Sequence, residues 1–390
     1  MKSRHAAGLM IVACLLYSWA ILQTASSPFS SSPAFAVTNF PRPSAEEQRP
    51  FFSEGFITPS VHGMTVHSGS ICELSGGILA SVWYGGSREG GQDVCVYFSS
   101  RSPGEGGEWN NPKSIVSRDS ASEELNRYIK KVGNPVIFSN SGQKLWLLYV
   151  SVSLGGWSGS SLNLKTSEDC GITWSRSVRL ILNPFFNVSE LVRNRPLPLA
   201  GGGFAIPIYH EFLGRFPEVL WLSQGSPGSP AAYRKSRMAG GRSYIQPSLV
   251  PLDAHNAAAF YRNMTPERSV AMATTCNAGL SWSQPRSVDL PNPNSALHAI
   301  LMPGGQILMA FNDSRKERDN LRLAISDDKG EDWKRIATLE NSEGAEFSYP
   351  YLVRDHGGLT HLVYTWRRKR IKHIVFNDAW VQRQMKSATP

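Results

Sequence analysis

The chain has 390 residues and a formal net charge of +9 at neutral pH, although only 18% of its residues are charged. Its 34 glycines, 25 prolines and 11 tryptophans favour many short strands joined by tight turns over helices, and all-β propellers of this length form single domains. Apart from the run Arg367-Arg368-Lys369-Arg370 the basic residues are scattered, and no recognition motif accompanies them. This pattern argues against nucleic-acid binding, and the excess of arginine suits an acidic sugar better.

Residues 1–36 have the pattern of an export signal. A basic start precedes an apolar stretch over residues 8–25, and Ala34-Phe35-Ala36 offers a small-x-small cleavage site. At roughly 18 residues the apolar stretch is also long enough to remain as a single membrane anchor. We therefore expect a secreted or extracytoplasmic protein, released by cleavage or held at a membrane by this segment alone.

An eight-residue motif recurs along the chain. Residues 167–174 match the Asp-box pattern S-x-D-x-G-x-T-W in full, and residues 275–282 and 326–333 repeat it closely. Residues 102–109 keep only its Ser, Gly and Trp, and a further remnant begins near Ser223. The starts are separated by roughly 65, 56, 52 and 51 residues, which is about one four-stranded propeller blade each.

Each motif is expected to shape a hairpin turn. The Asp carboxylate binds nearby backbone N–H groups, the Gly adopts a positive φ, and the Trp packs between neighbouring blades. We therefore assign Asp169 and Asp328 to folding and not to catalysis. Strand-like runs precede the motifs at Ile78–Tyr84, Val94–Phe98, Lys144–Val152, Ala257–Tyr261 and Gln306–Phe311. Five motifs and a closing segment predict an all-β fold, a six-bladed β-propeller over residues 50–380, preceded by a linker at residues 37–49.

The cysteines after the leader indicate no metal site. Cys72, Cys95, Cys170 and Cys276 form no CxxC pair and have no metal-ligand spacing, and their spacing leaves disulfide pairing open. The chain also has no Gly-rich phosphate loop, no HExxH and no EF-hand, so we expect no cofactor.

Several short segments carry a family resemblance. They are Trp83-Tyr84-Gly85-Gly86-Ser87-Arg88-Glu89-Gly90, Asn134-Pro135, Gln246-Pro247-Ser248, Asn292-Pro293-Asn294-Ser295, Phe347-Ser348-Tyr349-Pro350, Tyr364-Thr365-Trp366-Arg367-Arg368 and Ile371-Lys372-His373. Over roughly residues 60–378 the chain resembles the sialidase superfamily, in particular its group with a BNR-repeat-like domain. The resemblance implies a propeller of the sialidase type. It also implies three arginines that bind a substrate carboxylate, a Tyr nucleophile activated by a Glu, and an Asp acid/base.

Only some of the site residues that the resemblance implies are present in this chain. Tyr349 matches the nucleophile, and Arg262 and Arg318 match two of the three arginines, with Arg315 as a near alternative to Arg318. His67 stands where the remaining arginine is expected, and Gln246 stands where the activating Glu is expected. A neutral amide cannot take the proton from Tyr349.

Other groups are candidates for the missing proton transfer. Glu89 and Asp93 lie near the place of the family's acid/base Asp, and either is a candidate general acid if burial raises its pKa. His67 is a candidate proton-transfer group, because unperturbed imidazole titrates near neutral pH.

Further candidates would bind the substrate. Arg88 is a candidate for the missing cation, and Arg195 and Arg368, together with Arg193 and Tyr209, are candidates to line the central channel.

These residues predict a sialidase-like exo-glycosidase that releases a terminal acidic sugar, sialic acid or a related one, from glycans. One alternative is a glycosidase or lyase that acts on another uronic-acid-containing glycan, the lyase using His67 and Tyr349. The other alternative is a non-catalytic glycan-binding propeller. A carboxylate near Tyr349 with the geometry to move a proton would favour catalysis over binding.

Overall fold

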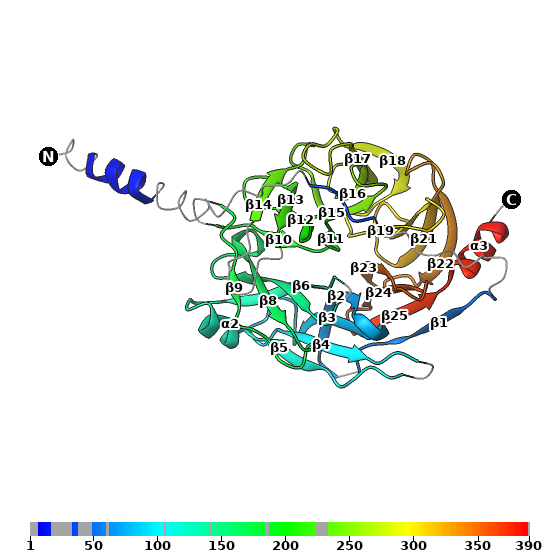
Figure 1. The fold of residues 1–390 in the computed structure, drawn as a ribbon, viewed down its shortest axis with the longest axis horizontal. Helices are drawn as coiled ribbons and strands as arrows, with labels where there is room; N and C mark the ends of the chain where they lie inside the picture. The colour runs from blue at the N-terminus through cyan, green and yellow to red at the C-terminus, as the bar shows by residue number, and fades with distance from the viewer. Residues whose placement is uncertain are drawn as a thin grey trace.

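Six antiparallel sheets form the blades of a propeller around one central axis, and we call the region along this axis the channel (Figure 1). The computed structural model describes residues 7–16, 33–37, 49–59, 62–104, 107–140, 142–183, 187–223 and 233–388. In the first five blades the chain begins at the innermost strand and proceeds outward, and in blade 6 it does so over the three C-terminal strands. The six-bladed all-β propeller predicted from the repeats is confirmed.

The first three blades use the following strands. Blade 1 contains β2 (Thr65–Glu73), β3 (Leu79–Gly86), β4 (Cys95–Arg101) and β5 (Lys113–Val116). Blade 2 contains β6 (Lys131–Phe138), β7 (Leu145–Val152), β8 (Ser160–Ser167) and β9 (Val178–Arg179). Blade 3 contains β10 (Leu191–Val192), β11 (Leu197–Pro198), β12 (Phe204–His210), β13 (Phe216–Leu222) and β14 (Tyr233–Arg237).

The other blades follow in chain order, with two helices outside them. Blade 4 contains β15 (Tyr244–Pro251), β16 (Ala257–Asn263), β17 (Ser269–Thr275) and β18 (Arg286–Pro291). Blade 5 contains β19 (His298–Leu301), β20 (Ile307–Phe311), β21 (Asn320–Ser326) and β22 (Lys334–Asn341). Blade 6 contains β23 (Phe347–Arg354), β24 (Thr360–Trp366), β25 (Arg370–Phe376) and β1 (Phe52–Phe56). The helices are α2 (Arg118–Glu124) and α3 (Asp378–Ser387).

The ring is closed by strands from both ends of the propeller sequence. β1 pairs antiparallel with β25, so the first strand becomes the outer strand of the last blade. Closure of this kind leaves no long unpaired edge at the joint. It also explains why the chain has five motif positions and not six. β25 continues into α3 and needs no turn to a fourth strand.

The Asp boxes lie in the turns between the third and fourth strands of their blades. In blade 2, the Asp169 carboxylate accepts hydrogen bonds from the Thr173 backbone N–H at 2.9 Å and from the Ser167 hydroxyl at 2.7 Å. The Thr173 hydroxyl, the Thr173 N–H and the Ser167 hydroxyl together lower the pKa of Asp169 to about 2. Asp328 accepts equivalent bonds in blade 5. The turn-forming role expected for Asp169 and Asp328 is therefore confirmed.

The motif tryptophans join neighbouring blades, as expected. Trp174 of blade 2 packs edge-on against Phe98 of blade 1, with ring centroids 5.7 Å apart. Trp333 of blade 5 makes the same contact with Phe260 of blade 4 at 5.5 Å. Turn chemistry and inter-blade packing thus come from one short motif.

The inner strands share a bulge near their first residues. The pairing register shifts in β2, β6, β15 and β23, and each shift contains a non-glycine residue with positive φ. These residues are Ser68, Asn134, Gln246 and Tyr349, with φ between 46° and 56°. Bulges redirect side chains and recur beside functional sites. Here they occur at the same end of the channel in four blades.

A segment far upstream is part of the folded propeller. Phe35 is 2% exposed and packs into the core between blades 3 and 4. Its backbone N–H donates to the carbonyl of Ala254 at 2.8 Å, and that of Ala36 donates to the carbonyl of Pro198 at 2.9 Å. The expected cleavage motif, residues 34–36, therefore lies within the folded structure.

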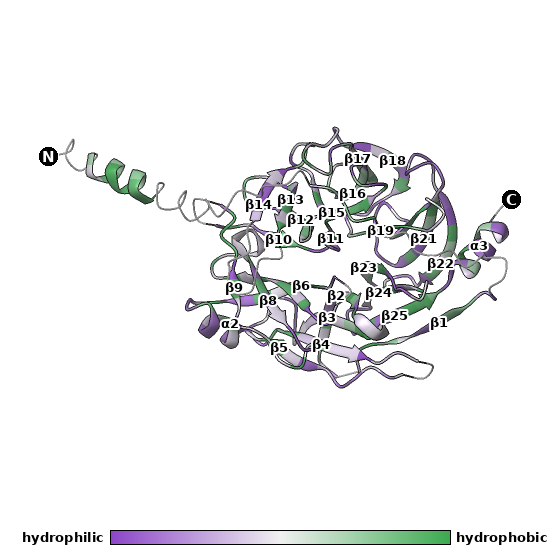
Figure 2. Cartoon of the chain, in the orientation of Figure 1, coloured by the Kyte–Doolittle hydropathy of each residue, from purple (hydrophilic) through white to green (hydrophobic). Residues whose placement is uncertain are grey.

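Residues 7–16 form a helix with exposed apolar side chains, green in Figure 2. Among the described residues no helix is both long and apolar enough to cross a membrane. The predicted apolar stretch continues into residues 17–25, which lie outside the described part of the chain.

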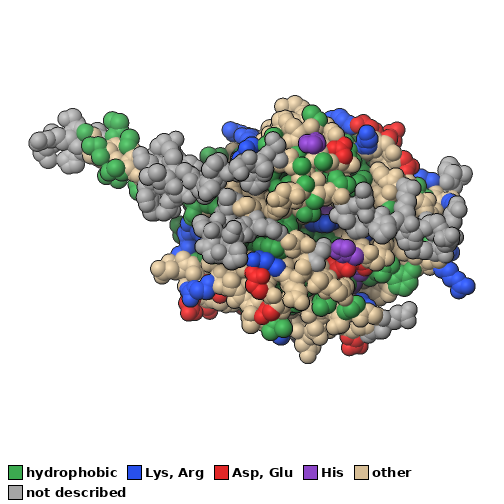
Figure 3. All heavy atoms as spheres, in the orientation of Figure 1, with side chains coloured by type: hydrophobic (Ala, Val, Ile, Leu, Met, Phe, Trp, Pro, Cys, Tyr) green, Lys and Arg blue, Asp and Glu red, His purple; other side chains and the backbone are tan. Residues whose placement is uncertain are grey.

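All five cysteines are free in this structure, so the cysteines whose pairing the sequence left open form no disulfide here. On the face seen in Figure 3, charged side chains of both signs are scattered and do not form a single basic patch.

Candidate active site

One end of the channel gathers side chains from all six blades. It is the end at which the inner strands begin, and we call it the front end. His67 lies on β2 of blade 1, Gln246 on β15 of blade 4 and Tyr349 on β23 of blade 6. Asn134 and Tyr209 come from blades 2 and 3, and Asn294 lies in the connection between β18 and β19 that leads into blade 5. All six residues take part in the contacts that follow.

The backbone of Tyr349 is bound by a buried arginine, Arg193. The side chain of Tyr349 is partly exposed, and the φ of this tyrosine, 56°, lies in the left-handed region. Arg193 donates from Nη2 to the backbone carbonyls of Tyr349 and Pro350, and its guanidinium lies 5.2 Å from the Tyr349 ring centroid. Burial lowers the pKa of Arg193 to about 10, so the group is still a cation at neutral pH. Arg193 thus stabilises an unfavourable backbone conformation at the candidate nucleophile.

His67 touches Tyr349 directly. The two rings meet edge to face with centroids 4.6 Å apart. His67 Nδ1 lies 3.1 Å from the Thr365 hydroxyl, and Nε2 lies 3.9 Å from a carboxylate oxygen of Glu346. Burial, followed by the charges of nearby arginines, holds the pKa of His67 well below its usual value. The imidazole is therefore neutral at neutral pH and able to accept a proton.

A single asparagine aligns two of the predicted arginines. Arg262 donates from Nε to the side-chain oxygen of Asn294 at 2.7 Å, and Arg318 donates from Nη2 to its backbone carbonyl at 2.8 Å. Asn294 has a φ of 59°. It belongs to a segment that carried the family resemblance, yet the sequence assigned it no role.

Arg368 adds a third cation at this end. It lies in the turn between β24 and β25, where it pairs with Glu89 and, at 3.4 Å, with Glu346. Burial acts against its charge, but the two carboxylates raise the pKa of Arg368. The Arg368 carbonyl also accepts from the N–H of Val66, the neighbour of His67. Arg368 thus lies beside the place where the family's remaining arginine was expected.

Gln246 forms hydrogen bonds with the side chains of Tyr209 and Arg262. Its Nε2 donates to the Tyr209 hydroxyl at 3.1 Å, and its Oε1 accepts from Arg262 at 3.4 Å. Asn134 donates to the same hydroxyl at 3.4 Å. Burial raises the pKa of Tyr209, which keeps its phenol neutral. None of these three groups is a proton acceptor of the strength of a carboxylate.

The two candidate acids have different surroundings. Glu89 accepts a hydrogen bond from the Tyr84 hydroxyl at 3.4 Å and pairs with Arg368, which connects it to the site. Asp93 accepts from the backbone N–H of Ser87 at 2.7 Å and from its hydroxyl at 3.0 Å. These bonds lower the pKa of Asp93, which is exposed. Asp93 therefore stabilises the loop that contains Ser87. Of the two carboxylates, Glu89 is the better placed candidate for the general acid.

Glu346 is a carboxylate near Tyr349 that the sequence reasoning did not identify. It lies three residues before Tyr349, and its Oε1 accepts from the Ser348 hydroxyl at 2.7 Å. The same oxygen lies 3.9 Å from Arg318 and 3.9 Å from His67. Its position three residues before the candidate nucleophile was the sequence signal that could have identified it.

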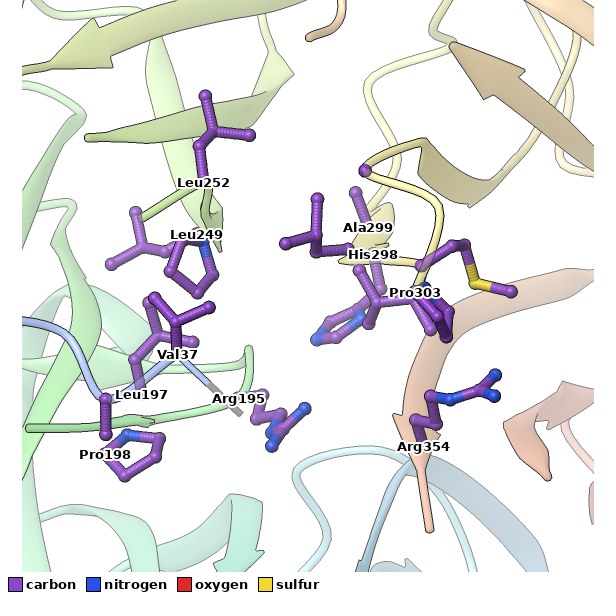
Figure 4. Close-up of a pocket in the computed structure, with 16 residues that line it drawn as sticks. Val37, Arg195, Leu197, Pro198, Leu249, Leu252, His298, Ala299, Pro303 and Arg354 are labelled. Atoms are coloured by element: carbon purple, nitrogen blue, oxygen red, sulfur yellow. The ribbon is translucent and has the colours of Figure 1, made fainter. Parts of the chain in front are cut away.

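Two predicted binding residues are not brought into these contacts. Arg88 is exposed in the loop after β3, and its side chain makes no hydrogen bond to any described site residue. Arg195 lines a different pocket, together with His298 and Arg354 (Figure 4).

A separate acidic cluster lies within blade 3. Ligand atoms of Glu190, His210 and Glu218 lie within 4.8 Å of one another. The Lys235 ammonium lies 2.7 Å from Glu190 and 3.2 Å from Glu218, so it already supplies the cation. We interpret the cluster as a buried ion-pair network.

Solved structures with a similar propeller fold include sialidases. The Hadza microbial sialidase Hz136 superposes with a TM-score of 0.63 at 16% identity over 80% of this chain. The Trypanosoma rangeli sialidase gives 0.64 at 13% over 87%, and a Dyadobacter fermentans DSM 18053 protein of unknown function gives 0.65 at 12% over 83%. The chain covers 65%, 61% and 97% of these three proteins, respectively. At such identities the likeness shows the sialidase fold alone.

No curated protein matches the sequence. The profile of the BNR repeat-like domain matches residues 77–362, which is most of the chain. The chain therefore belongs to the BNR repeat-like domain family, and its fold is that of the sialidase propellers.

Proposed function

We propose that the protein is a retaining exo-glycosidase that releases a terminal acidic sugar from glycans. The observation that carries this proposal is the contact between His67 and Tyr349 beside the arginines of the front end. It pairs a candidate nucleophile with a neutral proton acceptor. The sialidase fold of the structural neighbours supports a carbohydrate as the partner.

The arginines would bind the sugar's carboxylate. Arg262 and Arg318 are aligned through Asn294, and Arg368 provides a third guanidinium. Charge-assisted hydrogen bonds from guanidinium groups are strong and directional. Arg262 has only the neutral side chains of Asn294 and Gln246 as hydrogen-bond partners among the described residues, so a neutral sugar would leave this cation without an anion and the site would discriminate against it.

Each proton has a donor and an acceptor in this scheme. The Tyr349 oxygen attacks the anomeric carbon as its proton passes to His67. Glu89, protonated once the sugar carboxylate has taken its place on Arg368, gives its proton to the departing glycosidic oxygen as that bond breaks. Glu346, 3.9 Å from His67, stabilises the imidazolium. Water then loses a proton to Glu89 and attacks the same carbon as the bond from that carbon to the Tyr349 oxygen breaks, and this oxygen recovers its proton from His67. Two displacements retain the anomeric configuration.

The test uses methylumbelliferyl glycosides of sialic acid and glucuronic acid, with a neutral galactoside as control. We expect release from at least one acidic glycoside and none from the galactoside, and the first-formed anomer should keep the substrate's configuration. Folded protein that binds acidic sugars without cleaving any of them would instead be a glycan-binding propeller.

His67→Gln is expected to lower kcat by about 10²- to 10⁴-fold with little change in KM, because the proton acceptor is lost. Since the pKa of His67 is held below its usual value, the loss of rate caused by protonation of this imidazole should begin only below about pH 6.5. Rate profiles between pH 4 and 8 measure both effects. His67→Gln with an unchanged kcat would exclude this role.

The same contact favours a second candidate, a lyase. With the arginines neutralising a uronate carboxylate, His67 or Tyr349 would remove the adjacent proton, and the glycosidic bond at the next carbon would break. The product would be an unsaturated sugar with ultraviolet absorption and without oxygen from labelled water. Glycosidase action gives the opposite result in both respects.

We also propose that the chain through Phe35 remains attached in the mature protein. Cleavage after Ala36 would remove a buried Phe and its backbone hydrogen bonds. Ala254 follows the end of β15, so an upstream anchor would hold the propeller by the end opposite Tyr349. This orientation leaves the front end free for glycans.

The N-terminus of protein from a secretory host, read by intact mass, tests this retention. We expect it to lie before Pro33. Phe35→Ala should lower the free energy of unfolding by about 2 kcal/mol. A mature chain that starts at Val37 would refute the proposal.

A further inference from the structure

A second pocket lies at the opposite end of the channel from Tyr349, and we call it the rear pocket. On β23, Tyr349 is near the start and Arg354 is the last residue, which separates the two ends by about 15 Å. The pocket has a volume of about 420 Å³, within the range of small-molecule sites. Ala36 and Val37 of the docked upstream segment form part of its wall.

Among the described residues, the pocket contains one cation, Arg195, without a partner of opposite charge. Arg195 is partly buried, and its side chain makes no ion pair or hydrogen bond with any described residue. The neighbouring Arg354 differs, because Asp378 pairs with it at 2.6 and 2.7 Å. A guanidinium withdrawn from water without a counter-ion is costly, so an anion that reaches it is favoured.

His298 supplies a second hydrogen-bond donor. Its Nδ1 accepts from the backbone N–H of Leu352 at 3.2 Å, which places the proton of the neutral ring on Nε2. Burial keeps the pKa of His298 well below its usual value, so the ring is neutral. With Arg354 paired to Asp378, the described residues of the pocket offer one positive charge that is not paired with a carboxylate, on Arg195, and one neutral donor, a set suited to a monoanion.

The other walls are apolar. Leu197, Leu249, Leu252 and Leu301 line the space, and Figure 4 shows Leu249 and Leu252 on the side away from Arg195 and Arg354. Such walls favour the apolar part of a ligand at about 25 cal/mol per Å² buried. A fully polar sugar acid would leave its hydroxyls facing leucine side chains.

We propose that the rear pocket binds a small carboxylate with an apolar body, Arg195 and His298 holding the carboxylate and the leucines holding the body. The site is distinct from the front end and does not depend on the reaction proposed there.

Octanoate, below its micelle concentration, is the probe, titrated calorimetrically into the full chain. We expect saturable binding of one molecule per chain, weakened at least about tenfold by Arg195→Met and within about threefold of normal in Arg195→Lys. Arg318→Met, a matched change at the front end, should leave octanoate binding unchanged.

Leu301→Trp should fill the pocket and abolish binding, so it replaces Arg195→Met if that variant does not fold. Absence of saturable binding to the unmodified chain would overturn the proposal. Equal binding by Arg195→Met, or loss of binding in Arg318→Met, would overturn it as well.

Discussion

Tyr349→Phe is expected to lower turnover of the acidic glycoside by at least about a thousandfold, since it removes the attacking oxygen. The aromatic ring is retained, so the contact with His67 should persist. The hydrogen bond from Arg193 is made to the backbone carbonyl and should also persist. Thermal stability and binding of the free sugar acid should therefore be nearly unchanged.

Tyr351→Phe is the matched control. Tyr351 lies two residues further along β23, is fully buried, and has a hydroxyl without a hydrogen-bond partner among the described residues. Loss of that hydroxyl should leave kcat within about twofold, because no interaction is removed. Residual turnover within tenfold of normal in Tyr349→Phe would show that this phenol is not the nucleophile.

Lys235→Met is expected to have the largest effect on stability. Glu190 is fully buried and Glu218 is 5% exposed, and both depend on the Lys235 ammonium for compensation. Removing one partner of a buried ion pair costs about 3–5 kcal/mol, since the remaining charge has no counter-ion. Urea denaturation at pH 8 measures the loss.

The cost should be smaller at pH 5.5. Burial raises the pKa of Glu190 from its usual 4.5 to about 7. The folded protein therefore binds a proton in this interval that the unfolded chain does not, and the resulting stabilisation is lost as the pH rises through 7. Without Lys235 the raised pKa rises further, so acidification relieves the uncompensated charge.

Lys144→Met is the matched surface control. Lys144 pairs with Glu168 at 2.6 Å, but the two side chains are 35% and 69% exposed. Such a pair contributes about 0–1 kcal/mol. A cost for Lys235→Met no greater than this, or one that is equal at pH 8 and pH 5.5, would contradict the ion-pair interpretation of the cluster.

The blades could be predicted because their signal is local. In the complete Asp box every hydrogen bond joins residues two to four positions apart, so the sequence pattern contains the whole turn. The incomplete copy at residues 102–109 also falls between the third and fourth strands of its blade. The copy near Ser223 begins directly after β13 and continues outside the described residues.

Part of the front end could also be predicted from short sequence segments. Tyr349, Arg262 and Arg318 were recognised from short segments, as were the departures at His67 and Gln246. Proline follows the bulged Asn134, Gln246 and Tyr349, and this recurrence was a signal for the inner-strand bulges that remained unused.

By itself, the sequence determined the propeller, the number of its blades and the positions of the candidate nucleophile and two arginines. Only the tertiary structure decided their partners. Arg193 reaches the Tyr349 carbonyl across 156 positions, and Arg368 meets Glu89 across 279. Such contacts form because the closed ring and its bulges place the ends of six inner strands around one channel. A local sequence pattern contains no information about that arrangement. For the same reason Arg193 and Arg195, two residues apart, belong to opposite ends of the channel.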